Sequence, residues 1–473
     1  MIEIKDINQD PSMELFSSKG DVDPKLRTFL EEASSMLCKW LANANKNGPL
    51  PELFDFHAPL PLNKGVSRDC ILNDIHMIMD NAYQPSSPGA IAHLDPPPLT
   101  ASIVGDLISA GLNNNLLAEE LSPSLSLLEE QLCKWIANKL GMNSESTGVA
   151  VSGGSISNLM GLVLARNKAN LSYEKDVAII SSSDAHVSIE KSTKIMGLPP
   201  TSLFKVSTNS MGELSLSDLE HQINRVKYKG LKCMAIVATA GTTVSGSVDP
   251  LVEISKICAL NGIWLHIDAA IGGVFGLSDS TRSLVDGLKY ANSVTINPQK
   301  ILGIAKTSSI LLVSKGQDLS NCFSTGYPYL SESSNCAFNG GEMTIQGSRS
   351  AEILKLWLGL RQLGEEGISS ILENCITRRI YLEKKLRNDI FKIIRGPLHI
   401  ISFRPANFNE EQTELWSLKT KQELLKKKFM LSRPFHNGKY YLKAVLGNPY
   451  TTFDHLDHLS NILNSSVDSF LNE

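Results

Sequence analysis

The fold is decided by residues 264–270, which read WLHIDAA and are followed after Ile271 by two glycines. The run is mostly apolar, as a buried strand requires, until it reaches Asp268 near its end. A carboxylate there needs a partner, because an isolated buried charge is costly. A protonated pyridine nitrogen would be such a partner, and the small Ala270 leaves room beside it for a flat ring. The alternative interpretation is an aspartate that caps the next turn.

The chain on either side of this run alternates short β-branched stretches with helical patterns. The candidate strands are Gly148–Ser152, Val177–Ser181, Cys233–Thr239, Ile263–Ile267, Ser293–Asn297 and Ser308–Ser314. Helical patterns between several of them lie at Ile156–Ala169, Ser188–Met196 and Leu251–Leu260. Strands that are apolar on both faces and separated by helices indicate a mainly parallel sheet covered on both sides. The sequence therefore predicts an α/β fold.

We expect three parts along the 473 residues. Residues 1–87 are predicted to be an N-terminal helical segment, in which Pro24–Asn45 carries apolar residues at helical spacing. Residues 88–370 are predicted to be a large ligand-binding domain built on the parallel sheet. Residues 371–473 mix helical patterns with the strand-like pieces Ile400–Phe403 and Lys439–Val445, as a small α+β domain would.

The composition is that of an ordinary globular protein, with 42% hydrophobic and 20% charged residues. A formal net charge of −4 gives no basic excess for binding nucleic acid or an anionic membrane. The first residues lack the basic and apolar regions of a secretory signal, and no apolar run is long enough to cross a bilayer. The eight cysteines are scattered without a C-x-x-C pair. We therefore expect a cytoplasmic protein with reduced thiols and no metal site.

Four other features lie at the ends of candidate strands or follow them. Ser152–Ser155 opens a helix, whose backbone N–H groups suit a phosphate, although a tight turn is the alternative interpretation. His186 is either a ligand contact or a core histidine, and Gly241–Thr243 forms a turn. Lys300 is either a nucleophilic, partly desolvated amine or a surface lysine. Because open α/β sheets bind ligands at the carboxyl ends of their strands, we expect these residues to lie together.

Taken in their order, these motifs resemble the group II pyridoxal 5′-phosphate (PLP) decarboxylases, which act on glutamate, aromatic amino acids, cysteine sulfinate or diaminobutyrate. The resemblance runs from about Pro88 to Pro449. It implies a fold-type I enzyme, similar to aspartate aminotransferase, that binds PLP and forms a homodimer. The implied activity is removal of the α-carboxylate from an L-amino acid, which yields the amine and carbon dioxide.

The resemblance also implies roles for individual residues. Lys300 matches the lysine that forms a Schiff base with PLP, Asp268 the partner of the pyridine nitrogen, and His186 the residue stacked on the ring. These three are the expected catalytic residues. The other cofactor-binding residues implied by the resemblance are Gly154, Ser155, Thr243, Ala270, Asn297 and Gln299. Gly347–Arg349, followed by Leu354–Trp357, resembles an arginine-and-tryptophan signature that follows the mobile loop in the family.

Two departures from the family pattern concern catalysis. Gln299 stands where a histidine usually precedes the lysine, and glutamine cannot act as a general acid near neutral pH. Phe338 aligns with a loop tyrosine that protonates Cα in many members of the family. Related enzymes with phenylalanine there can divert to oxidative deamination, which produces an aldehyde, ammonia and peroxide. The loop is shorter here, so Tyr327 or Tyr329 is an alternative proton donor.

A third departure concerns the substrate. Lys443 stands where many members have an arginine, and lysine binds a carboxylate as a point charge. With His93 and Phe338 it is one of three candidate substrate contacts. The substrate itself stays open, since the scaffold handles acidic, basic and aromatic amino acids. The alternatives to a decarboxylase are an aldehyde synthase on the same scaffold and a non-catalytic homologue that acts as a binding protein.

Overall fold

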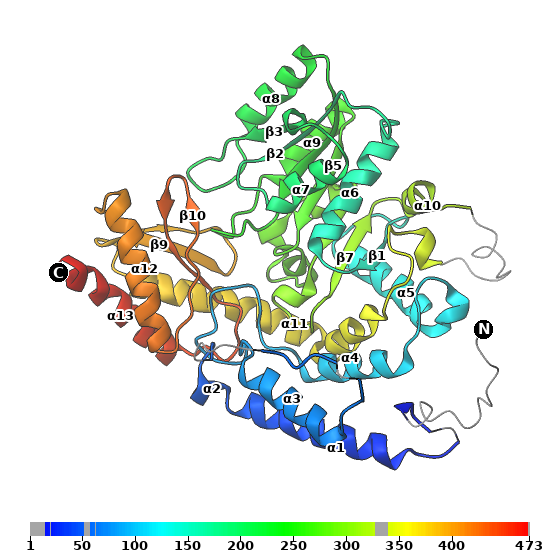
Figure 1. The fold of residues 1–473 in the computed structure, drawn as a ribbon. Coiled ribbons are helices and arrows are strands. Elements are labelled where there is room, and N and C mark those ends of the chain that lie inside the picture. Colours follow the sequence, from blue (N-terminus) through cyan, green and yellow to red (C-terminus); the bar gives the residue numbers. More distant parts are fainter. Residues whose placement is uncertain (1–14, 19, 52–56, 62, 327–338, 472–473) are drawn as a thin grey trace. The chain divides into compact units, whose positions relative to one another are not determined.

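The computed structural model describes residues 15–18, 20–51, 57–61, 63–326 and 339–471. The chain divides into two compact units, Met1–Pro88 and Gly89–Glu473. The helices of the first unit are α1 (Pro24–Ala42), α2 (Ala44–Asn47) and α3 (Arg68–Asp80), drawn in blue in Figure 1. The helix predicted over Pro24–Asn45 is thus present as α1 and α2. Asp23 caps α1, because its carboxylate accepts the backbone N–H groups of Lys25 and Leu26.

The described residues of the second unit contain a seven-stranded sheet in the order β1-β7-β6-β5-β4-β2-β3. Its strands are β1 (Thr147–Val151), β2 (Val177–Ser182), β3 (Leu203–Val206), β4 (Lys232–Thr239), β5 (Trp264–Ala269), β6 (Ser293–Ile296) and β7 (Ser309–Val313). Four pairings are parallel, and within this sheet β7 alone runs opposite to the other strands. The mainly parallel α/β fold predicted from the sequence is therefore confirmed.

Helices cover both faces of the sheet (Figure 1). On one face, Val149 and Val151 of β1 pack in a core with α6 (Gly154–Lys168), α7 (Val187–Ile195) and α10 (Gln317–Phe323). On the other, Ala150 packs in a core with α5 (Pro123–Lys139), α8 (Leu216–Tyr228) and α9 (Leu251–Asn261). Successive strand residues point to opposite faces, so each strand contributes to both cores and is apolar throughout.

The C-terminal part adds a three-stranded antiparallel sheet in the order β12-β9-β8. Its strands are β8 (Phe391–Ile394), β9 (Ile400–Pro405) and β12 (Leu442–Val445), beside a hairpin of β10 (Phe435–His436) and β11 (Lys439–Tyr440). Helices α12 (Glu410–Lys426) and α13 (Phe453–Leu471) pack with it. The strand-like piece predicted over Lys439–Val445 is present as β11 and β12, which are separated at Tyr441 and belong to different sheets.

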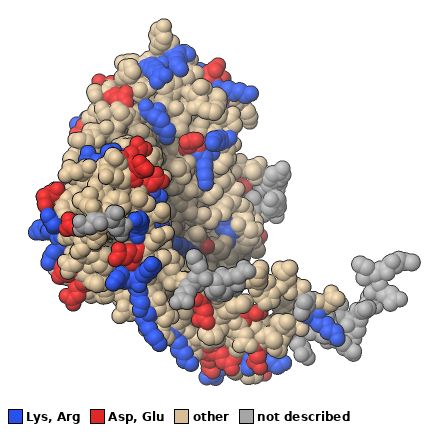
Figure 2. Space-filling view, turned by 60° about the vertical axis from the view of Figure 1, so that its left-hand side comes forward, with Lys and Arg blue, Asp and Glu red and all other residues tan. Residues whose placement is uncertain are grey.

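The other α-helices in the described part of the second unit are α4 (Thr100–Leu112) and α11 (Glu352–Lys385). α11 runs across residue 370 and is interrupted at Gly364, whose φ of 61° and ψ of 179° are not helical. The division at residue 370 stays a prediction. None of the helices in the described ranges combines the length and apolar character needed to cross a bilayer. Acidic and basic side chains are interspersed over the face shown in Figure 2.

Candidate active site

A cavity of about 170 Å³ lies at the carboxyl ends of the parallel strands. Asp268 comes from the end of β5, His186 follows β2, and Lys300 lies in the short turn after β6. Eight of the residues predicted from the sequence line it, namely Gly154, Ser155, His186, Thr243, Asp268, Ala270, Asn297 and Lys300. The strands run in one direction, so residues far apart in the sequence meet at one edge of the sheet.

The amine of Lys300 has a lowered pKa. The main cause is burial, which disfavours the charged ammonium, and the carboxylates of Asp268 and Asp95 act in the opposite direction. A lowered pKa increases the fraction of free amine, which is the nucleophilic form. Lys300 is therefore suited to form a covalent bond with a carbonyl carbon in the cavity.

The carboxylate of Asp268 is buried, with 5% of the residue exposed. Its Oδ2 accepts a hydrogen bond from Asn158 Nδ2 at 2.8 Å, and its Oδ1 accepts one from the backbone N–H of Ala270 at 3.2 Å. Each carboxylate oxygen has two lone pairs, so both retain capacity for another donor. A protonated ring nitrogen in the cavity would be a partner of the right charge.

The start of α6 forms the end of the cavity that suits an anion. Gly153 has a φ of 111°, and a side chain on Gly154 would place Cβ 2.9 Å from Asn297 Nδ2. Glycine is thus needed for this close approach of the helix to the turn after β6. Within the described residues, Asn297 Oδ1 and Thr239 Oγ1 are buried without a hydrogen-bond partner. Buried polar atoms are rarely left unpaired, so this wall fits a bound polar group, and the hydroxyl of Thr239 and the backbone N–H groups at the start of α6 are donors of the kind that a phosphate accepts.

His186 caps α7 and packs against the cavity. Its Nδ1 accepts the backbone N–H of Ser188 at 3.2 Å and lies 2.8 Å from the Ser188 hydroxyl. The pKa of His186 is lowered, chiefly by burial, although Asp268 acts to raise it. The imidazole is therefore neutral near pH 7.

The comparison with protein families places this cavity in a known context. The pyridoxal-dependent decarboxylase conserved domain matches residues 58–404 of the chain. The chain belongs to this family. The decarboxylase is 30% identical over 381 residues to the cysteine sulfinic acid decarboxylase of Rattus norvegicus. The alignment covers 77% of this chain and 75% of the rat protein. The predictions of the family, of a PLP-dependent amino acid decarboxylase and of PLP as cofactor are confirmed.

Solved structures share the fold of the decarboxylase. Oryza sativa TDC with PLP and tryptamine has a TM-score of 0.89 at 20% identity and covers 96% of this chain and 100% of that one. Rhodiola rosea 4-hydroxyphenylacetaldehyde synthase has a TM-score of 0.85 at 20% identity, and the match covers 94% of this chain and 98% of the synthase chain. One fold thus carries different activities, so it does not by itself choose the reaction of the decarboxylase.

Three predicted site residues of the decarboxylase do not line the cavity. Gln299 Oε1 accepts the backbone N–H of Ser308, which ties the turn after β6 to the start of β7. His93 is exposed. Lys443 is buried beside the cavity wall, where its Nζ donates to Thr243 O at 3.1 Å. Phe338 lies outside the described residues, as do the alternative donors Tyr327 and Tyr329.

Sequence reasoning missed three lining residues of the decarboxylase, which are Asn158, Thr239 and Ile271, whereas Gly241 and Thr242 belong to the predicted Gly241–Thr243 turn. Asn158 could have been found, because it lies four residues after Gly154 and therefore on the same face of α6. Gly241 has a φ of 104°, and a Cβ there would lie 2.9 Å from Ile271. This turn after β4 consequently requires glycine, which explains the Gly241–Thr243 motif.

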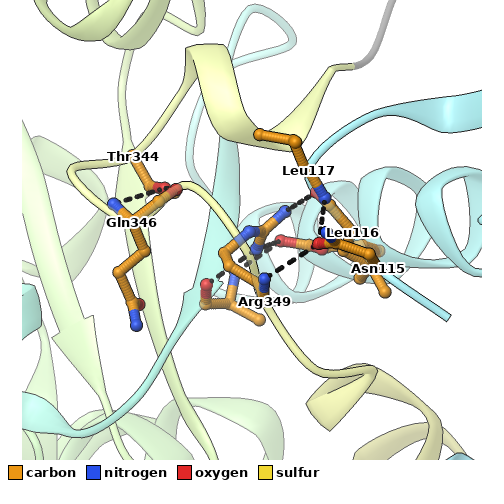
Figure 3. A network of polar contacts seen from close by, with 8 residues as sticks. Asn115, Leu116, Leu117, Thr344, Gln346 and Arg349 are labelled. Carbon is orange, nitrogen blue, oxygen red and sulfur yellow. Dashed lines mark hydrogen bonds and ion pairs between the residues drawn. The ribbon is translucent and has the colours of Figure 1, made fainter. Parts of the chain in front are cut away.

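Arg349 is not one of the residues that line the cavity, and Figure 3 shows the network of polar contacts around it. Its Nη1 bonds Glu129 Oε1 at 2.8 Å and Ala150 O at 3.0 Å, and its Nη2 bonds Leu116 O at 3.0 Å. The two side chains of the ion pair are only 5% and 0% exposed. The nearby Gln346 donates from Nε2 to Ser152 Oγ at 2.9 Å. The segment before α11 is thereby joined to β1 and to the turn that begins α6.

Proposed function

We propose that the decarboxylase acts at the cavity around Lys300 and removes the α-carboxylate of an L-amino acid with an acidic side chain. The observation that carries the reaction is the meeting of Lys300, Asp268 and His186 in one cavity. When bound, PLP supplies the electron sink for the cleavage of the bond between Cα and the carboxylate. Lys300 is the attachment point, Asp268 holds a proton on the ring nitrogen, and His186 and Ala270 enclose the ring.

The charge beside the cavity supports an acidic substrate. Lys443 is buried, and its Nζ reaches Thr243, which lines the cavity. An ammonium has three donors, so contact with Thr243 O leaves it able to bond a carboxylate or sulfinate. The rat relative is named for a substrate of this kind, cysteine sulfinic acid. Although His93 is exposed, neighbouring residues desolvate it enough to lower its pKa, and the charge of Lys443 acts in the same direction.

A spectrum of the purified protein tests the attachment point. We expect a visible band that disappears on borohydride reduction, with mass mapping that then locates the cofactor on Lys300. Lys300→Ala should leave no reduced adduct. A reduced adduct on another lysine would refute the assignment of Lys300.

A panel of acidic, aromatic and basic amino acids tests the substrate class. Carbon dioxide and the amine should form fastest from acidic members such as cysteine sulfinate, aspartate or glutamate. Turnover confined to aromatic or basic amino acids would refute the substrate class and leave decarboxylation intact.

A second candidate function is an aldehyde synthase, which Phe338 favours because phenylalanine has no proton to return to Cα. Aldehyde, ammonia and peroxide would then replace the amine among the products. Amine without peroxide would exclude this alternative.

We also propose that the protein is a cytoplasmic homodimer, as the family resemblance implies. Analytical ultracentrifugation should give a mass near twice 51.7 kDa. A monomer that retains full activity would contradict the proposal.

A further inference from the structure

A continuous chain of buried hydrogen bonds runs from β5 to the cavity. Trp264 Nε1 lies 2.8 Å from Ser293 Oγ, which lies 2.8 Å from His266 Nδ1. His266 Nε2 lies 3.0 Å from Asn158 Oδ1. The chain continues through Ser188 to His186, and its members before His186 are at most 7% exposed. Water therefore has little access to these bonds.

At the first bond of the chain only Trp264 can donate, because indole N–H has no acceptor. Ser293 Oγ accepts that proton and keeps its own proton, which is available to His266 Nδ1. Burial lowers the pKa of His266 to about 4, so the ring is neutral at pH 7 and carries one proton. The direction of the bond to His266 is set from the other end, because the amide oxygen of Asn158 can only accept. His266 therefore carries its proton on Nε2, donates it to Asn158 Oδ1 and accepts from Ser293 at Nδ1.

The carboxylate of Asp268 fixes the orientation of the Asn158 amide. An ionised carboxylate only accepts, so the NH₂ end of Asn158 faces Asp268, in agreement with Oδ1 facing His266. The two N–H groups of Asn158 Nδ2 go to Asp268 Oδ2 and to Ser188 Oγ, both at 2.8 Å. Since Ser188 Oγ accepts from Asn158, its own proton is left for His186 Nδ1 at 2.8 Å.

His186 thus receives two donors at the same nitrogen, the hydroxyl and the backbone N–H of Ser188. A ring nitrogen that accepts cannot carry a proton. We propose that Asn158 and Ser188 are positioning residues that fix His186 as the Nε2–H tautomer, with that N–H directed to the cavity. The consequence for catalysis rests on the proposed function, whereas the tautomer itself does not.

The tautomer is tested directly by NMR of the holoenzyme labelled with ¹⁵N-histidine, with His186→Gln used to assign the signals. We expect a protonated Nε2 and an unprotonated Nδ1 for His186. A protonated Nδ1 in the natural sequence would overturn the proposal even if the protein is a decarboxylase. The expected tautomer in a protein without decarboxylase activity would refute the proposed function alone.

Substitution of Ser188 tests the consequence. Ser188→Ala should bind PLP with its visible band but lose about tenfold in kcat, with little change in KM, because one hydrogen bond that orients the ring is lost. Ser188→Thr keeps the hydroxyl and should restore kcat. The matched control is Ser192→Ala, one turn along α7, whose hydroxyl bonds Ser188 O at 2.7 Å and does not contact His186. Equal kcat in Ser188→Ala and Ser192→Ala would refute the role of the Ser188 hydroxyl. If Ser188→Ala does not fold, the NMR measurement of the His186 tautomer in the natural sequence still tests the proposal.

Discussion

The amide nitrogen of Asn158 lies 2.8 Å from Oδ2 of Asp268 and also 2.8 Å from the hydroxyl of Ser188. One side chain on α6 thus holds both the carboxylate at the end of β5 and the residue that contacts His186. The two catalytic candidates are consequently coupled through a single buried amide. The predictions below test this arrangement, the charge beside the cavity and the ion pair that joins α5 to the segment before α11.

Asp268→Asn should bind PLP and lose nearly all decarboxylase activity, by a factor of about 10² or more. An uncharged amide cannot keep the ring nitrogen protonated, so the electron sink weakens. The visible spectrum reports binding, and release of carbon dioxide reports activity. Near-normal turnover would show that Asp268 does not have this role.

Gly161→Ala should disturb the ring of His266. A Cβ on Gly161 would lie 2.5 Å from Nδ1 and Cε1 of His266, which is fully buried and hydrogen-bonded at both nitrogens. We expect the free energy of unfolding to fall by about 1–3 kcal/mol and kcat to fall with it. Denaturant unfolding and steady-state kinetics measure the two effects.

Gly111→Ala is the matched control, because a Cβ there meets nothing within 4 Å and α4 favours alanine. Gly111→Ala should leave kcat unchanged, and its free energy of unfolding should equal or slightly exceed that of the natural sequence. Equal behaviour of the two glycine variants would contradict the tight packing of Gly161 on His266.

Lys443→Gln should raise KM for an acidic substrate by roughly tenfold or more, because the buried ammonium is replaced by a neutral amide. Lys443→Arg keeps the charge and should retain much of the affinity. The measurement is steady-state kinetics with an acidic and an aromatic amino acid. An equal rise in KM for both substrates would show that Lys443 does not select the acidic side chain.

The value of kcat/KM for an acidic substrate should fall as pH rises through about 8. Burial lowers the pKa of Lys443 to about 8, with Asp95 opposing and Lys300 reinforcing the shift. Below this pH the ammonium is charged and attracts an anionic side chain, and above it the charge is lost. Lys443→Arg stays charged and should show no decline near pH 8. A decline that persists in Lys443→Arg would belong to another group.

Arg349→Met should lower the free energy of unfolding by about 3–5 kcal/mol, because it leaves the buried carboxylate of Glu129 without its ion pair. The double variant Glu129→Gln, Arg349→Met should recover part of this loss, since no buried charge then remains unpaired. Denaturant unfolding compares the three proteins. A loss below about 1 kcal/mol in the single variant would contradict a structural role for this pair.

The sequence predicted the strands of the central sheet well, because buried parallel strands are apolar on both faces. It missed β3 and β8, which have four residues each and whose burial is incomplete. The seven residues 439–445 contained two strands of different sheets, and their local pattern gives no sign of the break at Tyr441. Short strands are defined by their partners more than by their own residues.

For this protein, the sequence by itself determined the order of the motifs and hence the family, the α/β fold and the identity of Lys300, Asp268 and His186 as candidates. Only the tertiary structure decided how their protons are arranged. Asn158, His266 and Ser188 come from α6, β5 and α7, and each residue's donor or acceptor state depends on the next one in space. Hydrogen-bond direction is a property of the assembled chain of contacts, so no local pattern in the sequence can specify it.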